Sequence, residues 1–445
     1  MRIAVLIPAL AVAALSVTLQ AGSGGDLGRQ VLAANDGWAS SGTGTTGGST
    51  AAGDQVYVVR TRAELVAALN NGVYPPPSST PSNAPKIIYV SGTIDANVDD
   101  ANQPLGCTNY NRNGFTIEAF LAAYDPATWG RVNPTGDLEN ARVASAAAQQ
   151  ARVRIRVGSN TTIVGLGDDA TLRGIWLDIR RHSTAGGNPT NIIIRNITFL
   201  DTYDCFPQWS PTDGAQGNWN AAYDSISLRD GDHIWIDHNR FADVTTADAT
   251  LPVYFGRLFQ VHDGELDITN ATDLVTVSWN HFLNHDKVML IGSSDNAPAD
   301  VGKLRVTLHH NLWEGTGQRT PRVRYGQVHI YNNLYYIAAN TGFQYAWGVG
   351  VQSSIYAEEN LFQVADGVTA DSLLGRFNGT SLHEHGNIFD SPSDTFVADL
   401  VGAYNATHDP DLVESVSWTP AFYTDIDLAR RLKRIVPGLV GPRNW

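Results

Sequence analysis

One stretch in the second half of the chain contains two acidic side chains followed by three basic ones. Asp263 and Asp267 stand four positions apart, and Lys287 follows in an apolar run. Arg319 and Arg324 then bracket a short segment that contains a proline. Clustered carboxylates are the hard oxygen ligands that calcium prefers, and lysine and arginine bind the carboxylates of a partner. The stretch therefore predicts a metal-assisted site for a polymer that carries acidic groups.

A short repeat indicates which elements position these side chains. An asparagine is followed two places later by an aromatic residue at 239–241, 280–282, 311–313, 333–335, 360–362 and 387–389, and more loosely at 196–199. The shortest gap between copies is 22 residues, which fits one coil of a solenoid, and the longer gaps fit a coil with a loop. A β-propeller is the alternative, but 22 residues are too few for a blade of four strands. The repeat predicts an all-β chain folded as a parallel β-helix.

The two repeated residue types predict how neighbouring coils contact each other. Asparagine tolerates the left-handed turn conformation, and its side chain can hydrogen-bond to its copy in the next coil, about 4.8 Å away. The aromatic residues are expected to stack in the core.

Local patterns predict further elements around the repeat. Residues 61–64 have the spacing of a capping box, so a short helix is expected there, closing one end of the β structure. Residues 101–152 predict a largely helical excursion on the outside of the main body. Residues 22–54 have the composition of a flexible linker, most strongly at 40–53, with an anchored turn inside it at 36–38, and 428–436 predict a basic helix that caps the last coil. The remaining expectations are strands at 56–59, 86–90, 154–157, 161–165, 191–195 and 287–292, and helices at 115–124 and 137–152.

Composition and charge limit the partners. The net charge of -14 argues against a nucleic acid, and no segment after the N-terminal run is apolar for long enough to span a membrane. An acidic protein repels an acidic polymer unless its binding site is locally positive. Five basic side chains supply such a patch: Lys287, Arg305, Arg319, Arg322 and Arg324.

The N-terminus predicts export. Residues 1–21 combine Arg2, an uncharged apolar run and small residues near Ala21, as a secretory signal peptide does. An exported chain permits a disulfide between its two cysteines, Cys107 and Cys205. Residues 22–445 are expected to form one secreted, extracellular domain.

Several ordered motifs resemble polysaccharide lyase family 1, the pectate lyases, in its bacterial branch. Its Trp-Ile-Asp-His, His-Asp-Gly-x-x-Asp and His-Asp-Lys motifs stand at 235–238, 262–267 and 285–287. Its Arg-x-Pro-Arg-Val-Arg-x-Gly and Val-His-x-Tyr-Asn-Asn motifs stand at 319–326 and 328–333. Shorter likenesses occur at 26–28, 35–38, 204–209 and 222–224, so the resemblance covers nearly all of the chain after the signal.

The resemblance implies a right-handed, single-stranded parallel β-helix with short capping helices and long loops. It also implies cleavage of polygalacturonate (pectate) by calcium-dependent β-elimination, by a protein that acts as a monomer. Carried over to this sequence, the Ca2+ carboxylates are Asp224, Asp263 and Asp267. Arg319 is the base, and Lys287 and Arg324 bind the carboxylate of the substrate and stabilise the charge that develops.

The chemistry explains these residue types. The proton to be removed lies next to a uronate carboxylate and is weakly acidic while that group is an anion. Calcium and cationic side chains on the carboxylate stabilise the enolate-like transition state. An arginine base is unusual, because arginine side chains have a pKa above about 12, and a neighbouring lysine and calcium disfavour its charged form.

Each of these residues also has a purely structural interpretation, and three other functions stay open. Asp224 could be a turn residue and Lys287 a solvated strand residue. Arg319 and Arg324 could be partners in structural ion pairs. Arg322, Asp237 and the histidines at 238, 262, 285, 309, 310 and 329 are expected to be structural, as turn or ladder residues. The alternatives are a silent β-helix that binds acidic glycan, a glycoside hydrolase with paired carboxylates, and a pectin lyase that cuts methyl-esterified substrate. Loss of activity on chelation and unsaturated product ends would exclude the first two.

Overall fold

The structure is a computed structural model that describes residues 10–11, 26–182, 187–339, 342–423 and 425–444. The predicted signal peptide, residues 1–21, lies outside the described residues apart from the short strand β1 (Leu10–Ala11), which pairs with β3 (Val73–Tyr74). Among the described residues, no helix is both long and apolar enough to cross a membrane.

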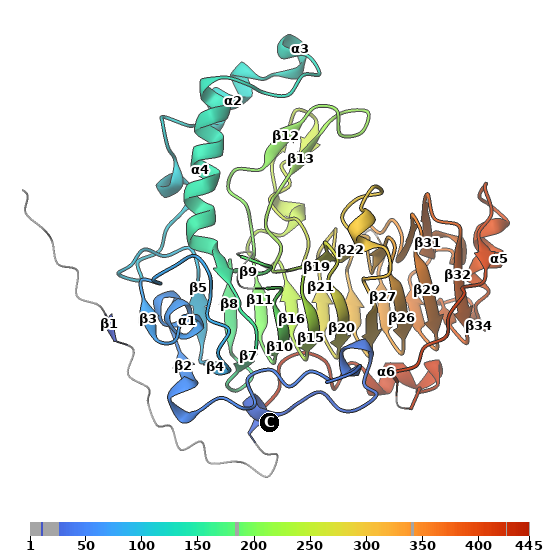
Figure 1. Ribbon diagram of the computed structural model, residues 1–445. Coiled ribbons are helices and arrows are strands. Elements are labelled where there is room, and N and C mark those ends of the chain that lie inside the picture. The colour runs from blue at the N-terminus through green and yellow to red at the C-terminus, as the bar shows by residue number, and fades with distance from the viewer. Residues whose placement is uncertain (1–9, 12–25, 183–186, 340–341, 424, 445) are drawn as a thin grey trace, which may run out of the picture.

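Three long sheets of mainly parallel strands wind around one apolar core, and successive strands along the chain pass from one sheet to the next (Figure 1). Within the described residues, sheet A has eleven strands, sheet B ten and sheet C eight. This is a parallel β-helix, as the repeat predicts.

The strands of each sheet follow in chain order from one end of the solenoid to the other. Sheet A consists of β2 (Val56–Val59), β4 (Lys86–Val90), β7 (Thr161–Gly165), β10 (Thr190–Arg195), β15 (Asp232–Asp237), β20 (Asp273–Ser278), β23 (Val306–His309), β26 (Gln327–Tyr331), β29 (Ser354–Glu358), β32 (Ser381–His385) and β35 (Val413–Glu414). Sheet B consists of β5 (Thr93–Asp95), β8 (Thr171–Arg173), β11 (Thr198–Leu200), β16 (Arg240–Ala242), β21 (His281–Leu283), β24 (Leu312–Glu314), β27 (Leu334–Ile337), β30 (Leu361–Val364), β33 (Ile388–Asp390) and the antiparallel β34 (Thr395–Val397). Sheet C consists of β6 (Arg154–Arg156), β9 (Trp176–Ile179), β14 (Ile226–Arg229), β19 (Leu266–Thr269), β22 (Leu290–Ile291), β25 (Arg322–Val323), β28 (Trp347–Gly350) and β31 (Leu374–Phe377).

A ladder of buried asparagines joins neighbouring coils at the turn between sheets A and B. The side-chain oxygen of each asparagine accepts hydrogen bonds from the backbone and side-chain nitrogens of the preceding one, at 2.9–3.1 Å. The ladder runs through Asn239, Asn280, Asn311, Asn333, Asn360 and Asn387. The aromatic residues stack beside it, with ring centroids 4.3–5.9 Å apart from Phe199 to Phe362. Both predicted contacts are confirmed.

Two details of the ladder differ from expectation. The left-handed conformation belongs to the residue before each ladder asparagine, for example His238 at φ 51° and Trp279 at φ 55°, because the chain must turn before the amide can point inward. The looser copy at Asn196 is one position out of register. Ile197 takes the ladder position and donates its backbone N–H to Asn239, while Asn196 bonds to Gly165 and to the C-terminal segment.

Helices and hairpins project from one side of the solenoid, between sheets B and C (Figure 1). The helices are α2 (Ile117–Ala123), α3 (Pro126–Trp129) and α4 (Asp137–Val153), and the hairpins are β12–β13 (Gln208–Ser210, Asn218–Asn220) and β17–β18 (Val253–Tyr254, Arg257–Leu258). They share a second apolar cluster that includes Phe120, Phe206 and Trp219. The predicted disulfide is present between Cys107 and Cys205 and ties the helical excursion to the loop that carries β12 and β13.

The ends of the solenoid are closed by short helices. At the N-terminal end, α1 (Arg62–Leu69) begins with the predicted capping box, in which Thr61 and Glu64 exchange side-chain-to-backbone hydrogen bonds. At the other end, α5 (Leu400–Asn405) adds Leu400, Val401 and Tyr404 to the main core.

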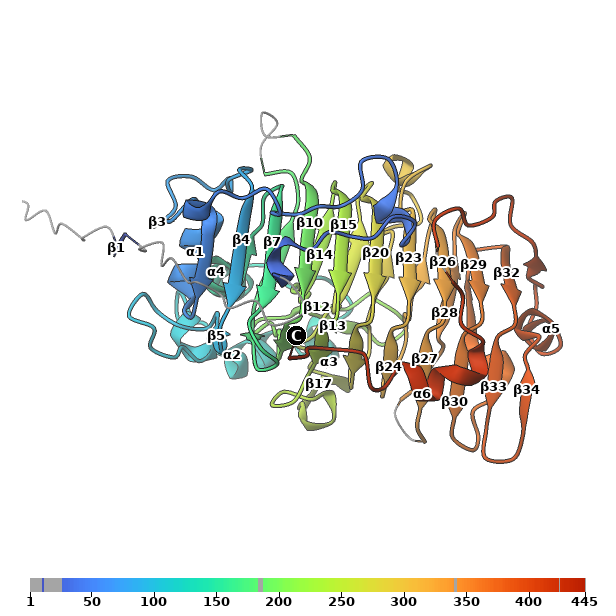
Figure 2. The same cartoon turned by 90° about the horizontal axis from the view of Figure 1, so that it is seen from below.

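Two terminal segments lie differently from expectation. Residues 26–55 are no free linker: they run across the strands of sheet A (Figure 2), where Leu32 and Ala39 pack on Ile193 and Trp235. The helix α6 (Leu432–Ile435) does not cap the last coil. It lies against the outer face of sheet B, where Leu432 packs with Leu312, Leu334 and Leu361. Contacts between residues more than 70 positions apart decide both placements.

Candidate active site

The predicted site residues gather on the outer face of sheet C and the loops that enter it. Asp267 points outward from β19 because its neighbours Leu266 and Ile268 are buried in the core. Asp224 lies two residues before β14, the strand that pairs with β19 in register, and Asp263 lies three residues before β19. The fold therefore brings together three carboxylates that come from two coils.

Gly264 lies between the carboxylates of Asp224 and Asp267, close to both. Its backbone N–H donates to Asp224 Oδ1 at 3.0 Å. A Cβ atom at this position would lie 2.6 Å from Asp267 Oδ1 and 3.1 Å from Asp224 Oδ1, so a larger residue would fill the space between them. Asp263 is the most accessible of the three, with 34% of its side chain exposed.

Burial and repulsion between carboxylates disfavour the charged forms of Asp224 and Asp267. Burial first, then Asp267 and Asp263, raise the pKa of Asp224 well above its usual range. Burial and Asp263 raise the pKa of Asp267 to about 6. A cation between the three groups would relieve this repulsion, and an all-oxygen, anionic donor set fits a hard cation such as calcium.

Lys287 borders this carboxylate group. Its Nζ lies 3.3 Å from Asp263 Oδ1, and 15% of its side chain is exposed. The predicted strand 287–292 is shorter in the structure: β22 covers Leu290–Ile291, and Lys287 makes an isolated bridge to Gln318. Gly292, at φ 87°, turns the chain away after two strand residues.

Arg319 faces the same carboxylates from two coils farther along, directly before β25, and the coil of Lys287 and β22 lies between them. Its backbone adopts the left-handed conformation, at φ 59°, and its carbonyl accepts a hydrogen bond from Met289 at 2.8 Å. The Arg319 guanidinium acts against the effect of burial on the pKa of Asp267, which places its charge beside that carboxylate. Its Nε is buried and has no hydrogen-bond partner among the described residues.

Arg324 and Arg322 are held by the protein itself. Arg324 donates from Nε to Asp295 Oδ1 at 2.5 Å and from Nη1 to the carbonyl of Gly292 at 2.9 Å. Arg322 lies over the ring of Phe377, 3.9 Å from its centroid, which agrees with the expected structural role. Two donors of Arg324 are thus committed within the protein.

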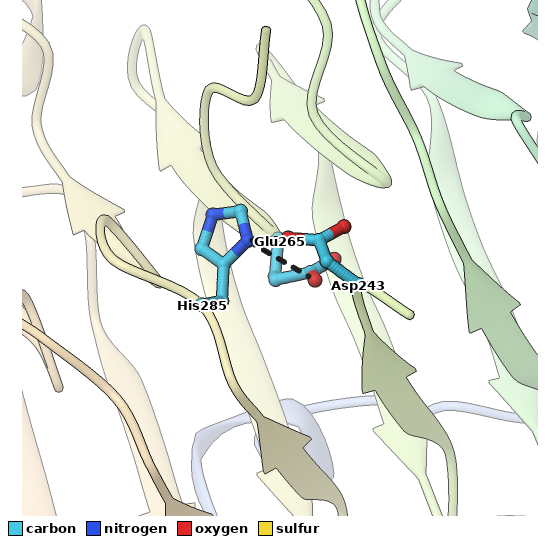
Figure 3. A group of neighbouring side chains, drawn as sticks. All are labelled: Asp243, Glu265 and His285. Carbon is cyan, nitrogen blue, oxygen red and sulfur yellow. Dashed lines mark hydrogen bonds and ion pairs between the residues drawn. The ribbon is translucent and has the colours of Figure 1, made fainter. Parts of the chain in front are cut away.

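Three buried side chains, Asp243, Glu265 and His285, form a group beneath the site that the sequence did not predict. The ligand-type atoms of Asp243, Glu265 and His285 all lie within 4.8 Å of one another (Figure 3). His285 Nδ1 contacts Asp243 Oδ2 at 2.6 Å, and its Nε2 contacts the backbone carbonyl of Asp263 at 2.8 Å. Burial opposes the charged ring, but Asp243 and Glu265 outweigh it and raise the pKa of His285 to about 10.

This group is a charged hydrogen-bond network and does not offer a metal site. Both ring nitrogens of His285 face oxygen acceptors and donate to them, so neither has a lone pair for a metal ion. The ring nitrogens of His262 lie 2.8 Å from the carbonyls of Thr202 and Thr246, and its Nδ1 lies 3.3 Å from Asp243 Oδ1. The network anchors the loop that carries Asp263.

The expected roles of the histidines are therefore partly wrong. His262 and His285 are parts of this network and not turn or ladder residues. Both stand directly before the aspartate of a motif, and this shared position was the signal available in the sequence. His238 and His310 do take left-handed turn positions, at φ 51° and 53°, and stack on either side of Trp279.

Asp237, expected to be structural, lies on sheet A away from this face. It pairs with Arg195 at 2.8 Å, accepts a hydrogen bond from Ser278 and contacts His238. These partners fully account for its burial.

Comparisons with known proteins agree on one family. The sequence pattern described as "Pectate lyase" matches residues 131–409. A pectate lyase of Bacillus subtilis (strain 168) is 42% identical over 96% of this chain and 96% of its own length. Pectate lyase E of Dickeya dadantii (strain 3937) is 33% identical over 81% of this chain and 77% of its own length.

Solved structures give the same result. A thermostable pectate lyase superposes with a TM-score of 0.90 at 47% identity, over 95% of this chain and 100% of that one. A pectate lyase bound to a hexasaccharide superposes with a TM-score of 0.86 at 42% identity, over 94% of this chain and 99% of that one.

Proposed function

The chain belongs to the pectate lyase family and is a polysaccharide lyase, and from this we propose that it cleaves polygalacturonate by calcium-dependent β-elimination. The products are 4,5-unsaturated oligogalacturonates. The solved relative that binds a hexasaccharide supports an extended sugar chain as the substrate.

One observation carries the proposal: anionic and cationic side chains meet on a single face of sheet C. Asp224 and Asp267 approach each other around Gly264, and Lys287 contacts Asp263. Asp224, Asp263 and Asp267 would hold the calcium ion together with a carboxylate of the substrate.

The cationic residues bind and orient the uronate. When bound, calcium neutralises the substrate carboxylate and makes the adjacent C–H bond more acidic. Lys287, fixed beside Asp263, directs its ammonium group toward the same carboxylate. Arg324 is held by Asp295 and Gly292, which orients its remaining donors for the substrate.

Arg319 is the proposed base. In its neutral form it takes the proton from the carbon next to the carboxylate, the electron pair forms the double bond, and the glycosidic oxygen leaves with the bonding electrons. A side-chain hydrogen bond with Tyr345 helps to orient the Arg319 guanidinium on this face, beside Asp267.

The two other classes of function have less support. A glycoside hydrolase needs a carboxylic acid and a carboxylate on either side of the scissile bond, whereas these carboxylates converge around Gly264. A silent glycan-binding β-helix does not require Lys287, Arg319 and Arg324 together at the carboxylate cluster.

We also propose that residues 22–445 form one secreted domain that acts as a monomer. The disulfide between Cys107 and Cys205 supports export, because such bonds persist in oxidising compartments.

A measurement of the preference for unesterified over methyl-esterified substrate distinguishes the proposed pectate lyase activity from a pectin lyase activity. Asp263→Ala should raise the calcium concentration for half-maximal rate on polygalacturonate roughly tenfold or more, because the number of anionic ligands sets the affinity. Residual activity on highly methyl-esterified pectin should barely change. Asp411→Ala, at an exposed site away from sheet C, is the control.

A parent enzyme that cuts esterified pectin faster than polygalacturonate, with no effect of chelator, would establish the pectin lyase reading instead.

A further inference from the structure

A second group of basic side chains lines a cavity of about 300 Å³ at the N-terminal edge of sheet C. The cavity lies between the edge strand β6, helix α1 and the loop 76–81. Its lining includes four arginines, Arg62, Arg152, Arg154 and Arg156, and we call it the arginine pocket. A volume of this size matches the smaller sites for small molecules.

The arginines of this pocket are incompletely neutralised. Asp100, in the lining, pairs with Arg152 at 2.8 Å, and Asp178 pairs with Arg154 at 2.6 Å. Arg62 hydrogen-bonds to the backbone: its Nε donates to the carbonyl of Arg152 at 2.8 Å. Arg156 has an Nη1 contact to the carbonyl of Ser79 at 3.0 Å. Four cations therefore meet two carboxylates.

Unused donors and repulsion in the pocket point to an anion. The Nε atoms of Arg152 and Arg156 are buried and have no hydrogen-bond partner among the described residues. Burial and the charge of Arg154 lower the pKa of Arg156, and burial and Arg152 lower that of Arg62. A carboxylate in the pocket would relieve this repulsion.

The pocket lies in line with the active site. Arg156, Asp178, Ser227 and Asp267 are register partners on the adjacent strands β6, β9, β14 and β19. Three strand spacings of about 4.8 Å separate Arg156 from Asp267, or roughly 14 Å. A linear polymer bound along sheet C would cover this distance with a few sugar rings.

Further arginines bridge the interval. Arg154 and Arg180 lie over the ring of Trp176, 5.2 and 5.9 Å from its centroid, and remain partly exposed. Arg229 ends β14 beside Thr269 of β19. The positive charge therefore continues from the carboxylate site to the pocket.

We propose that the arginine pocket is a distal subsite that binds a carboxylate of the same polygalacturonate chain whose other residues occupy the active site. The inference rests on the proposed function and extends it: the enzyme favours long chains over short ones, because an oligomer shorter than the roughly 14 Å between Arg156 and Asp267 does not reach both places. The occupant is a uronate within a chain and not a free anion.

Two variants test the pocket without touching the residues of the active site. Arg156→Gln removes a charge with its unused donor. Ser79→Glu places a carboxylate on the exposed lining loop, where it competes with the substrate for the arginines and deletes no contact of the serine side chain. Arg434→Gln on α6 and Ser415→Glu near β35, both exposed, are the matched controls.

Each variant should raise KM for polygalacturonate about tenfold, the effect of losing one charged hydrogen bond. The value of kcat should stay at that of the parent, as should both constants on trigalacturonate, and the controls should match the parent on both substrates. Equal losses on both substrates, or unchanged KM on polygalacturonate, would overturn the proposal. A variant whose melting temperature no longer responds to inorganic phosphate, with unchanged KM on polygalacturonate, would make the pocket a site for small anions and also overturn it. A parent that forms no unsaturated product from either substrate would instead refute the proposed function.

Discussion

Arg319 adopts a backbone conformation that few residues other than glycine and asparagine take, at φ 59°. Such conformations persist where the surrounding structure imposes them, and they concentrate at functional sites. Here the hydrogen bond from Met289 to the Arg319 carbonyl helps to hold the turn. The consequence is a guanidinium group whose charge acts on Asp267 from two coils away.

Replacing this side chain tests its role as the base. We expect Arg319→Lys to keep the fold and the affinity for polygalacturonate and to lower kcat by roughly 10²–10⁴-fold, the usual contribution of a positioned base. Lysine keeps the positive charge and loses the fork of donors. Steady-state kinetics and circular dichroism measure both quantities, with Arg434→Lys as the control. A kcat near that of the parent would remove Arg319 from this role.

The pH dependence follows from the two kinds of group at the site. The pKa of Asp267 is raised to about 6, so protons compete with calcium for this carboxylate as the pH falls through that value. An arginine base becomes neutral more often as the pH rises. We therefore expect the rate to rise from about pH 6 into the alkaline range, and added calcium to shift the acidic limb to lower pH.

A profile of kcat/KM that peaks in mildly acidic solution would indicate a carboxylate base. If the acidic limb of the pH profile does not move when the calcium concentration is raised, the carboxylates do not bind calcium and this prediction is wrong.

At the scale of the element, the asparagine ladder is the feature that fixes the coils in register. Asn311 accepts from Asn280 and donates to Val277 and Asn333, all while fully buried. The network thus satisfies polar backbone groups at a turn that water does not reach.

Removing one rung should destabilise the solenoid. Asn311→Ala leaves donors of Asn280 and the carbonyl of Val277 without their partner. We expect a loss of about 3 kcal/mol in the free energy of unfolding, since each buried group left unsatisfied costs about 1–3 kcal/mol. Denaturant unfolding measures this, and Asn140→Ala, on the exposed face of α4, should change stability little. Equal stability of the two variants would contradict the role of the ladder.

Across the whole molecule, the charge distribution resolves the conflict between an acidic protein and an acidic substrate. The chain carries a net charge of -14, yet Lys287, Arg319, Arg322 and Arg324 meet on the outer face of sheet C. Arg305, also expected in this patch, pairs instead with Asp273 on sheet A. The arginine pocket extends this positive region to the N-terminal end of the sheet. A local field, and not the net charge, decides which polymer approaches.

The solenoid was predictable from the sequence because a copy of the asparagine in every coil places Asn311 on Asn333 whatever the intervening loops do. The proposed site residues came instead from the resemblance to a family, since Asp224 and Asp267 belong to no repeat and meet only in the folded chain around Gly264. The positions of Trp38 and Leu432 were not predictable, because each depends on contacts with strands far away in the chain. The network of His262 and His285 was missed because burial, which turns a polar residue into a paired one, is not visible in the spacing.

The central claim is that calcium-dependent elimination is the reaction performed at the carboxylates and Arg319. The most direct measurement is analysis of the chain ends released from polygalacturonate by the parent enzyme, with calcium and with a chelator. We predict unsaturated ends, detected by their ultraviolet absorbance, that form with calcium and stop forming when the chelator is added. Saturated reducing ends with no unsaturated product, or unsaturated ends formed equally fast in chelator, would contradict the account.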